Sequence, residues 1–377
     1  MTKLIKFKAA LLSCMVIAMA YWPGSAFGQL RHVHGQAIDR AQVHLSGGVQ
    51  VAAQSSEQHT RAKRAYDRRK YKKAFEIWSP LAEQGDPVAQ AYLGVMYENG
   101  QGVTPDPVIA ADWYRKAADQ GEPEAQLNLA VLYENGEGVD QDYGKAAHWY
   151  EKAAEQDVML AQYSLGLMYR EGRGVPRDDK RAYKWLSKVA EQGFAVAQVN
   201  VAFMLRDGNG VETNHAEAAK WFQKAANKNH PVAQNNLGLL YASGLGVAQS
   251  DKQAAHWYQK AADQGLANAQ YNLADAYDNG RGVPQSHDQA ARWYQLAAER
   301  GEIPAQLRLA ALYESGLGVP EDLVRAYMWL DIATDTSSST TERETAVSRR
   351  QDVAGLLTPD QISKAQMLSG PIKAQLR

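Results

Sequence analysis

The chain has 377 residues, of which 45% are hydrophobic and 22% charged, a composition typical of a soluble folded protein with a sizeable core. The formal net charge of -1 excludes an overall basic field of the kind that attracts nucleic acid. The single cysteine, Cys14, lies in an N-terminal apolar stretch, so a chain that loses this stretch has no disulfide, zinc–thiolate site or cysteine nucleophile.

Residues 1–28 have the features of a secretory signal peptide. Three lysines precede the apolar stretch 9–20, and a small-residue segment follows it. The apolar stretch is shorter than the about 20 residues that a membrane-spanning helix needs. We therefore favour cleavage after Ala26 or Gly28 over a membrane anchor or acylation at Cys14. The sequence thus predicts a periplasmic or secreted protein, whose mature chain has 38 cations, 42 acids and a net charge of −4.

Residues 29–60 lack helical periodicity, and we interpret them as a flexible leader. A small hairpin around residues 42–51 is the alternative. Residues 61–84 are predicted to form an N-terminal cap, a degenerate repeat, because Ala74 and Trp78 repeat the spacing of later helices.

Residues 85–336 consist of seven blocks of 36 residues, without insertion or deletion. A repeat of this length is the signature of a solenoid. In every block Ala-Gln precedes apolar residues at helical spacing, as in Ala89, Leu93 and Met96, and Gly-x-Gly-Val follows. The glycines indicate the end of a first helix, because glycine adopts the left-handed conformation without strain.

A second helix is predicted in the remainder of each block. It begins with a side chain that can accept a hydrogen bond from the first helical turn, and an alanine and a tryptophan follow at fixed distances. We expect the alanines to let helices approach closely and the tryptophans to fill the space between them. The expected N-cap residues are Asp106, Asp142, Asp178, Asn214, Ser250, Ser286 and Asp322; the tryptophans are Trp113, Trp149, Trp185, Trp221, Trp257, Trp293 and Trp329.

Residues 337–377 depart from the repeat pattern and are predicted to form C-terminal capping helices near 342–355 and 359–369. Two capping boxes, Thr341–Glu344 and Thr358–Gln361, indicate where these helices begin. Polar closing helices would end the stack without inviting a further unit.

These motifs resemble Sel1-like repeats, which are related to the tetratricopeptide repeat. The segment Ala233–Ala262 follows the Sel1-like pattern nearly without departure, from Ala-Gln-x-x-Leu-Gly-x-x-Tyr to Ala-x-x-Trp-Tyr-x-Lys-Ala-Ala. The resemblance implies an all-α fold, a right-handed α/α superhelical solenoid of Sel1-like helix–turn–helix repeats, and a role as adaptor or scaffold. Bacterial members are often exported, and some act in envelope assembly, polysaccharide export or host-cell interaction. A cysteine-rich subgroup joins each repeat with a disulfide, and this chain lacks the cysteines for that arrangement.

No residue pattern indicates catalysis, a cofactor or a metal site. Neither His-Glu-x-x-His nor Gly-x-Ser-x-Gly is present. His32, His34 and His44 lie in the leader, where solvated side chains are favoured over metal ligands. The Gly-x-Gly loops follow helices and lack the third glycine of a nucleotide-binding loop. We therefore expect a protein that is not an enzyme.

The candidate partner-binding residues lie on the first helices, which line the concave side in this architecture. Their seventh, eighth and eleventh block positions are expected to point away from the packing face. A row of asparagines would hydrogen-bond an extended peptide, and tyrosines would supply flat contact area. The alternative is that the asparagines satisfy neighbouring backbone groups within the stack. The candidates are Asn128, Tyr163, Asn200, Asn236, Tyr271, Asn272 and Arg308.

The basic run 61–73 is a second candidate surface, with eight cations and one acid. It would suit an acidic partner or anionic lipid headgroups, and its other interpretation is a solvated helix face.

The predicted function is an exported, non-enzymatic scaffold for protein–protein interaction in the bacterial cell envelope. The first alternative is a scaffold associated with polysaccharide or peptidoglycan in polymer export or assembly. The second is a hydrolase whose carboxylates lie in the groove. We expect neither a nucleic-acid partner nor a stable membrane span.

Overall fold

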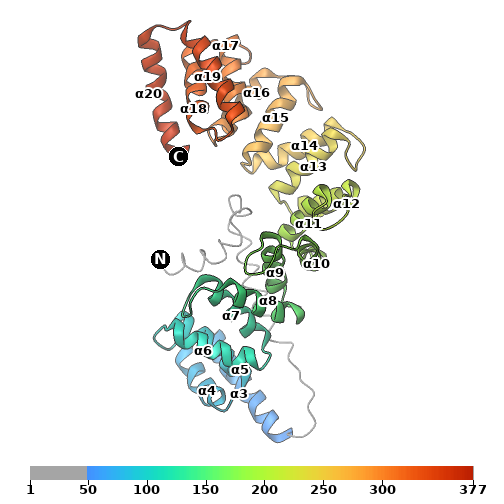
Figure 1. The fold of residues 1–377 in the computed structure, drawn as a ribbon, viewed down its shortest axis with the longest axis vertical. Coiled ribbons are helices and arrows are strands. Elements are labelled where there is room, and N and C mark those ends of the chain that lie inside the picture. The colour runs from blue at the N-terminus through green and yellow to red at the C-terminus, as the bar shows by residue number, and fades with distance from the viewer. Residues whose placement is uncertain (1–48, 377) are drawn as a thin grey trace. The chain divides into compact units, whose positions relative to one another are not determined.

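The computed structural model describes residues 49–376, and all regular structure in that range is α-helix, as expected (Figure 1). The predicted signal peptide and residues 29–48 of the predicted leader lie outside the described residues. The helices group into two compact units that divide near Gly193, with the loop 209–212 belonging to the first unit.

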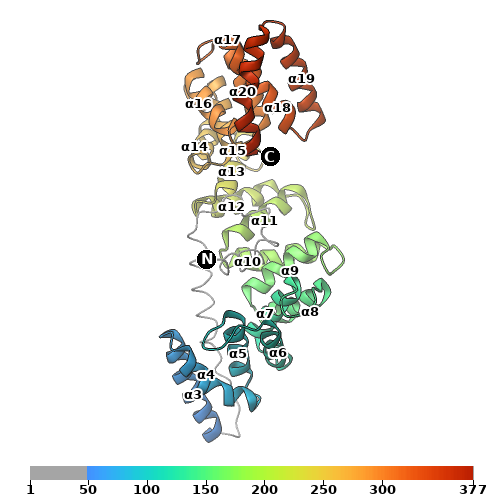
Figure 2. The ribbon, with the colours of Figure 1, turned by 90° about the vertical axis from the view of Figure 1, so that its left-hand side faces the viewer.

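Each unit consists of antiparallel helix pairs, and consecutive pairs in a unit pack side by side (Figures 1 and 2). The helices of unit 1 are α3 (Val49–Asp67), α4 (Tyr71–Glu83), α5 (Pro87–Asn99), α6 (Pro107–Asp119), α7 (Pro123–Asn135), α8 (Tyr143–Glu155), α9 (Met159–Glu171) and α10 (Asp179–Glu191). Those of unit 2 are α11 (Ala195–Asp207), α12 (His215–Asn227), α13 (Pro231–Ser243), α14 (Asp251–Asp263), α15 (Ala267–Asn279), α16 (His287–Ala298), α17 (Ile303–Ser315), α18 (Leu323–Thr336), α19 (Thr340–Ala354) and α20 (Pro359–Leu376).

The two glycines of each loop have different tasks. The first, such as Gly172 with φ 68°, ends the first helix in the left-handed conformation, as predicted. The second allows one backbone to approach another. A Cβ on Gly174 would lie 2.1 Å from the carbonyl oxygen of Tyr143, at the start of α8. Each loop therefore packs directly on the second helix of the preceding repeat, and only glycine fits there.

The predicted N-caps of the second helices are confirmed in all seven repeats. Asp142, for example, accepts a hydrogen bond from the backbone N–H of Lys145 at 2.9 Å. Each of the other six residues accepts from the first turn in the same way.

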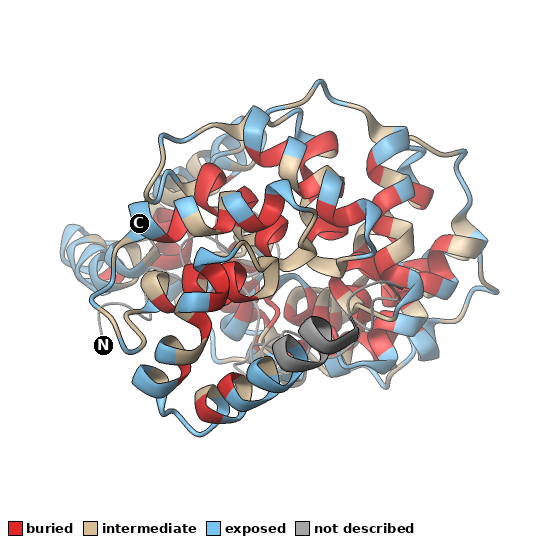
Figure 3. Cartoon of the chain, turned by 90° about the horizontal axis from the view of Figure 1, so that it is seen from below, coloured by how far each residue is buried: buried red, intermediate tan, exposed pale blue. Residues whose placement is uncertain are grey.

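The core is built from alanines and from the residue after each tryptophan. The alanines at the fourth position after the N-cap are at most 3% exposed, from Ala110 to Ala326. The expectation for the tryptophans is confirmed for four of the seven: Trp185, Trp221, Trp257 and Trp329 are buried, whereas Trp113, Trp149 and Trp293 are only half-buried. The side chain after each tryptophan also points inward. Figure 3 shows buried positions along the faces where helices meet. The seven inward residues are at most 6% exposed: Tyr114, Tyr150, Leu186, Phe222, Tyr258, Tyr294 and Leu330.

The glutamine of the Ala-Gln pair joins neighbouring repeats. Nε2 of Gln126 donates to the carbonyl oxygen of Ala118 in the preceding helix at 3.2 Å, and Oε1 accepts from Gln156 at 2.8 Å. The glutamines of this pair are at most 4% exposed. The bond from Nε2 to the preceding helix recurs for Gln90, Gln162, Gln234, Gln270 and Gln306, so a buried side-chain donor is the feature that these blocks share.

The N-terminal cap begins earlier than the sequence indicated. Helix α3 starts at Val49, so residues 49–60 are helical instead of belonging to an unstructured leader. Its described core-facing residues, Ala62 and Ala65, pack with Trp78 of α4. The sequence shows no clear helical periodicity here, because the apolar residues on this face are small and polar residues surround them.

The C-terminal cap has the two predicted helices, α19 and α20. The box at Thr358 and Gln361 is confirmed by reciprocal hydrogen bonds of 3.3 and 2.8 Å. The cap of α19 is different: Ser339, and not Thr341, accepts from the N–H of Glu342. Both helices pack on α18.

Candidate interaction surface

The asparagines of the first helices are half-buried and bonded within their own unit. Asn128 hydrogen-bonds to Tyr114, whose phenol pKa is raised above its ordinary value by burial and by Glu98, and this contact opposes the shift. Asn236 donates to the carbonyl oxygen of Val232 at 2.8 Å and accepts from Arg206 at 3.2 Å.

The same holds further along unit 2. Asn272 donates to Oδ1 of Asn235 at 2.9 Å, which links α15 to α13. Asn200 is half-buried on α11. These contacts agree in part with the alternative interpretation, in which asparagines satisfy neighbouring backbone groups. Asn236 bonds the backbone carbonyl of Val232, whereas Asn128 and Asn272 bond side chains of other helices.

The tyrosines and the arginine differ among themselves. Tyr163, expected to offer flat contact area, is only 4% exposed and belongs to the core of unit 1. Tyr271 is half-buried, with its ring 5.7 Å from that of Tyr294. Arg308 is exposed on α17, and Leu239 on α13 is 41% exposed at the eleventh position.

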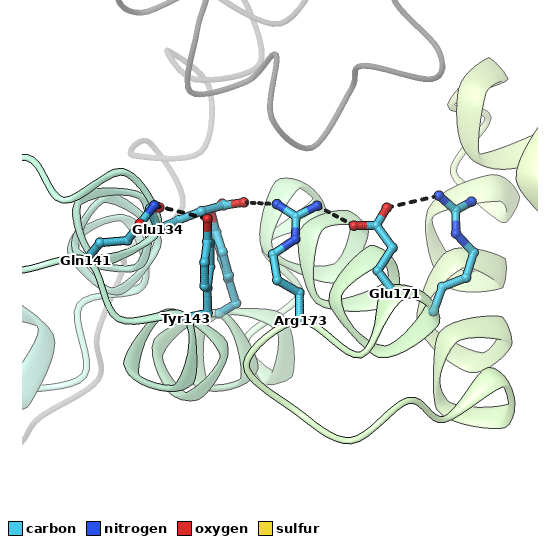
Figure 4. A network of polar contacts seen from close by, with 7 residues as sticks. Glu134, Gln141, Tyr143, Glu171 and Arg173 are labelled. Atoms are coloured by element: carbon cyan, nitrogen blue, oxygen red, sulfur yellow. Dashed lines mark hydrogen bonds and ion pairs between the residues drawn. The ribbon is translucent and has the colours of Figure 1, made fainter.

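A charged network that the sequence did not reveal links repeats two and three (Figure 4). Glu134, 4% exposed, accepts from the hydroxyl of Tyr150 at 2.7 Å and from Arg173 at 3.1 Å. Arg173 also pairs with Glu171, which contacts Arg170 at 3.3 Å. A carboxylate this buried needs such partners, since an unpaired charge would be strongly destabilising.

The equivalent acid one repeat earlier has no such cation. Glu98 accepts from the hydroxyl of Tyr114 at 2.6 Å, but Glu137 stands where Arg173 stands in the next repeat. Burial raises the pKa of Glu98, and Glu137 raises it further, against the hydrogen bond from Tyr114. The sequence signal for both arrangements is the residue at the seventeenth position of the block that follows the glutamate: Arg173 for Glu134 and Glu137 for Glu98.

The second helices carry a row of lysine–tryptophan pairs. A lysine three residues after the tryptophan lies over the ring, at 4.0 Å from its centroid for Lys116, 4.9 Å for Lys188, 3.7 Å for Lys224 and 4.7 Å for Lys260. Cation–π attraction holds each lysine over the face of the ring while its ammonium group stays in water. Trp185, Trp221 and Trp257 of this row are buried, and Trp113 is half-buried.

Within residues 49–376, no group of three or more His, Cys, Asp or Glu side chains has a metal-binding arrangement. In the same range no helix combines the length and the apolar character needed to cross a bilayer.

The fold defines a class: an all-α repeat protein of stacked helical pairs. Seven segments match the family model described as Sel1 repeat, at residues 87–122, 123–158, 160–194, 195–230, 231–266, 267–302 and 303–335. The chain therefore belongs to the Sel1 repeat family, whose members typically mediate protein–protein interaction and are generally non-enzymatic scaffolds.

The chain is also similar to several solved structures. The crystal structure of a Sel1 repeat protein from Oxalobacter formigenes is 33% identical, with a TM-score of 0.61, over 81% of this chain and 90% of that chain. A protective antigen of uropathogenic Escherichia coli displaying an SLR fold is 29% identical over 84% of this chain and 83% of that chain, with a TM-score of 0.43. Cysteine-rich protein B of Helicobacter pylori is 25% identical over 34% of this chain and 92% of that chain, with a TM-score of 0.28. The comparison with curated proteins gives no match.

Proposed function

We propose that this protein is an exported, non-enzymatic scaffold or adaptor that binds another protein in the bacterial cell envelope. The observation that carries the proposal is the uninterrupted array of seven Sel1 repeats. The signal-peptide pattern of residues 1–28 supports export.

The binding mechanism follows from the hydrogen bonds inside the stack. Asn236 and Asn272 are held by neighbouring residues, so the first helices present a preformed surface. A preformed surface loses little conformational entropy on binding. The side chains available to a partner at this surface are the exposed ones, Arg308 and Leu239.

Photo-crosslinking in intact cells tests the proposal. A crosslinking residue replaces Arg308 or Leu239 on the first helices, and a control replaces the exposed His256 on the second helix α14. We expect the first two probes to capture the same envelope protein and the control to capture none. Crosslinks to glycan alone would favour the polysaccharide or peptidoglycan scaffold, and a protein found only in the cytoplasmic fraction would contradict export.

A further inference from the structure

The hairpin of α3 and α4 concentrates positive charge in unit 1. Residues 57–73 contain eight cations and two acids, a net charge of +6. Residues 74–193 contain 11 cations and 20 acids, a net charge of −9. The two signs are therefore separated within one unit, although the whole chain is close to neutral.

Seven of the eight cations of this hairpin are exposed, and Lys63 is half-buried. Lys63 pairs with Asp67 at 3.2 Å, and no other side chain of the hairpin's cations has an acidic partner within residues 56–376. We call the exposed set the basic surface: Arg61, Arg64, Arg68, Arg69, Lys70, Lys72 and Lys73.

Two features of the backbone bring these side chains together. Arg61 and Arg64 are three residues apart on one face of α3. Arg68 follows in the turn just after the helix, where its backbone N–H donates to the carbonyl oxygen of Arg64 at 3.3 Å. The turn between α3 and α4 has three residues, with Arg69 in the left-handed conformation at φ 58°, in place of the longer Gly-x-Gly loop of the repeats. Lys72 and Lys73 on the first turn of α4 therefore lie close to the end of α3.

We propose that the basic surface binds an acidic polypeptide segment of the partner. The inference rests on the proposed function, in which the partner is a protein, and it adds the chemistry of recognition. Opposite charges at exposed sites steer association and set orientation more than they add affinity. The surface would thus align the partner at the N-terminal cap.

The surroundings favour a narrow acidic segment over an extended polyanion. The adjacent helix α5 begins after Asp86 and carries Glu98, and the next repeat adds Glu122 and Glu124. An anionic membrane or a long nucleic acid that extended beyond the hairpin would meet the net negative charge of the rest of the unit, which repels its phosphates. No large apolar side chain between residues 56 and 84 is among the exposed ones, so this part of the hairpin presents charge and not an apolar surface.

Fluorescence anisotropy with a labelled peptide of ten glutamates tests the proposal on the purified full chain. The variant Arg61→Gln/Arg64→Gln/Arg68→Gln removes three charges from the basic surface. The control Lys180→Gln/Lys252→Gln/Lys364→Gln removes three exposed charges elsewhere. Because exposed ion pairs are individually weak, we expect about tenfold weaker peptide binding for the first variant and no more than about a twofold change for the control. Binding should also weaken steeply as salt increases.

Three results would overturn the proposal: no peptide binding at low salt, equal loss in both variants, or tighter binding to phosphatidylglycerol vesicles or to an oligothymidine than to the peptide. Circular dichroism of both variants verifies that the helices are intact. Crosslinking at Arg308 does not depend on these arginines. If the peptide-binding experiment fails, the proposed function is therefore still tested separately by the crosslinking.

Discussion

Gln120 donates a hydrogen bond from Nε2 to Oε1 of Gln90 at 2.8 Å, and so joins the residue after α6 to the first turn of α5 in the same repeat. The pair recurs at the same spacing in three further repeats, as Gln126–Gln156, Gln162–Gln192 and Gln234–Gln264. In the sixth repeat Arg300 replaces the second glutamine, and Oε1 of Gln270 is buried without a partner within residues 56–376.

Replacing Arg300 with glutamine should therefore stabilise the protein. Arg300→Gln supplies the missing donor to Gln270, and a buried hydrogen bond contributes about 1 kcal/mol. The exposed hydrogen bond from Arg300 to the carbonyl oxygen of Leu296 is lost at little cost. Urea unfolding of wild type and variant measures the difference. The matched control, Gln264→Ala, should destabilise by about the same amount, and a destabilised Arg300→Gln variant would contradict the role of the pair.

Glu98 should make stability fall as pH rises. Burial and Glu137 raise its pKa above the ordinary 4.5, so the folded chain holds this proton more tightly than the unfolded chain does. Its contribution is therefore most favourable below the unfolded pKa and is lost as pH rises through the folded pKa.

Glu137→Arg tests this relationship by copying the arrangement of Glu134 with Arg173. The variant should be more stable than wild type near neutral pH by up to about 1 kcal/mol, because the new pair is partly exposed. The gain should shrink on acidification to about pH 4, as Glu98 is protonated. We would measure the free energy of unfolding across this pH range. As a control, Glu137→Arg should give no such gain in a protein that already carries Glu98→Gln, because the carboxylate is absent.

Asp331 fastens the C-terminal cap and should give the opposite pH response. It is 4% exposed and accepts from Arg350 at 2.7 Å, Ser369 at 2.7 Å and Lys373 at 2.5 Å. Burial raises the pKa of Asp331, but Lys373, Ser369 and Arg350 outweigh it and hold the pKa below its ordinary value. Its stabilisation is therefore present above the unfolded pKa and lost as pH falls through the folded pKa.

Asp331→Asn should release α20 from α18. Breaking a buried ion pair costs about 3 kcal/mol, and it leaves Lys373 with Asp335 alone. Hydrogen exchange should accelerate in α20 and leave α5 unchanged. The control Lys364→Ala, on an exposed position of the same helix, should exchange like wild type; equal protection in Asp331→Asn would show that the carboxylate does not hold the cap.

Gly174→Ala should be among the most damaging small substitutions in the repeats. The new Cβ would collide with the backbone of Tyr143, and φ of 70° is strained for alanine, so we expect a loss of about 3 kcal/mol or more. Gly370 is the contrasting case, because it lies within α20 and a Cβ there meets nothing within 4 Å. Gly370→Ala should therefore cost about 1 kcal/mol at most, because the gain in helix propensity is offset by the restriction that Pro371 places on the residue before it. Thermal unfolding of both variants measures the contrast, and similar melting temperatures would refute it.

The sequence alone determined the repeat, its two helices and their ends. These features are local: Asp142 meets its N–H partner within three residues, and Gly172 needs only its own φ angle. A periodic pattern repeated seven times also averages out chance variation in any one block, so the sequence by itself indicates the family.

The tertiary structure decided which side chains remain available to a partner. Periodicity placed Tyr163 and Asn236 on the same side of their helices, but the contacts that bury one and pair the other come from neighbouring repeats. Likewise, Glu134 and Glu98 occupy equivalent positions in their repeats. The loop of the next repeat brings Arg173 to Glu134 but Glu137 to Glu98, so only Glu134 forms an ion pair there. A pattern fixes the direction of a side chain within its helix, whereas burial and charge depend on residues 30 or more positions away.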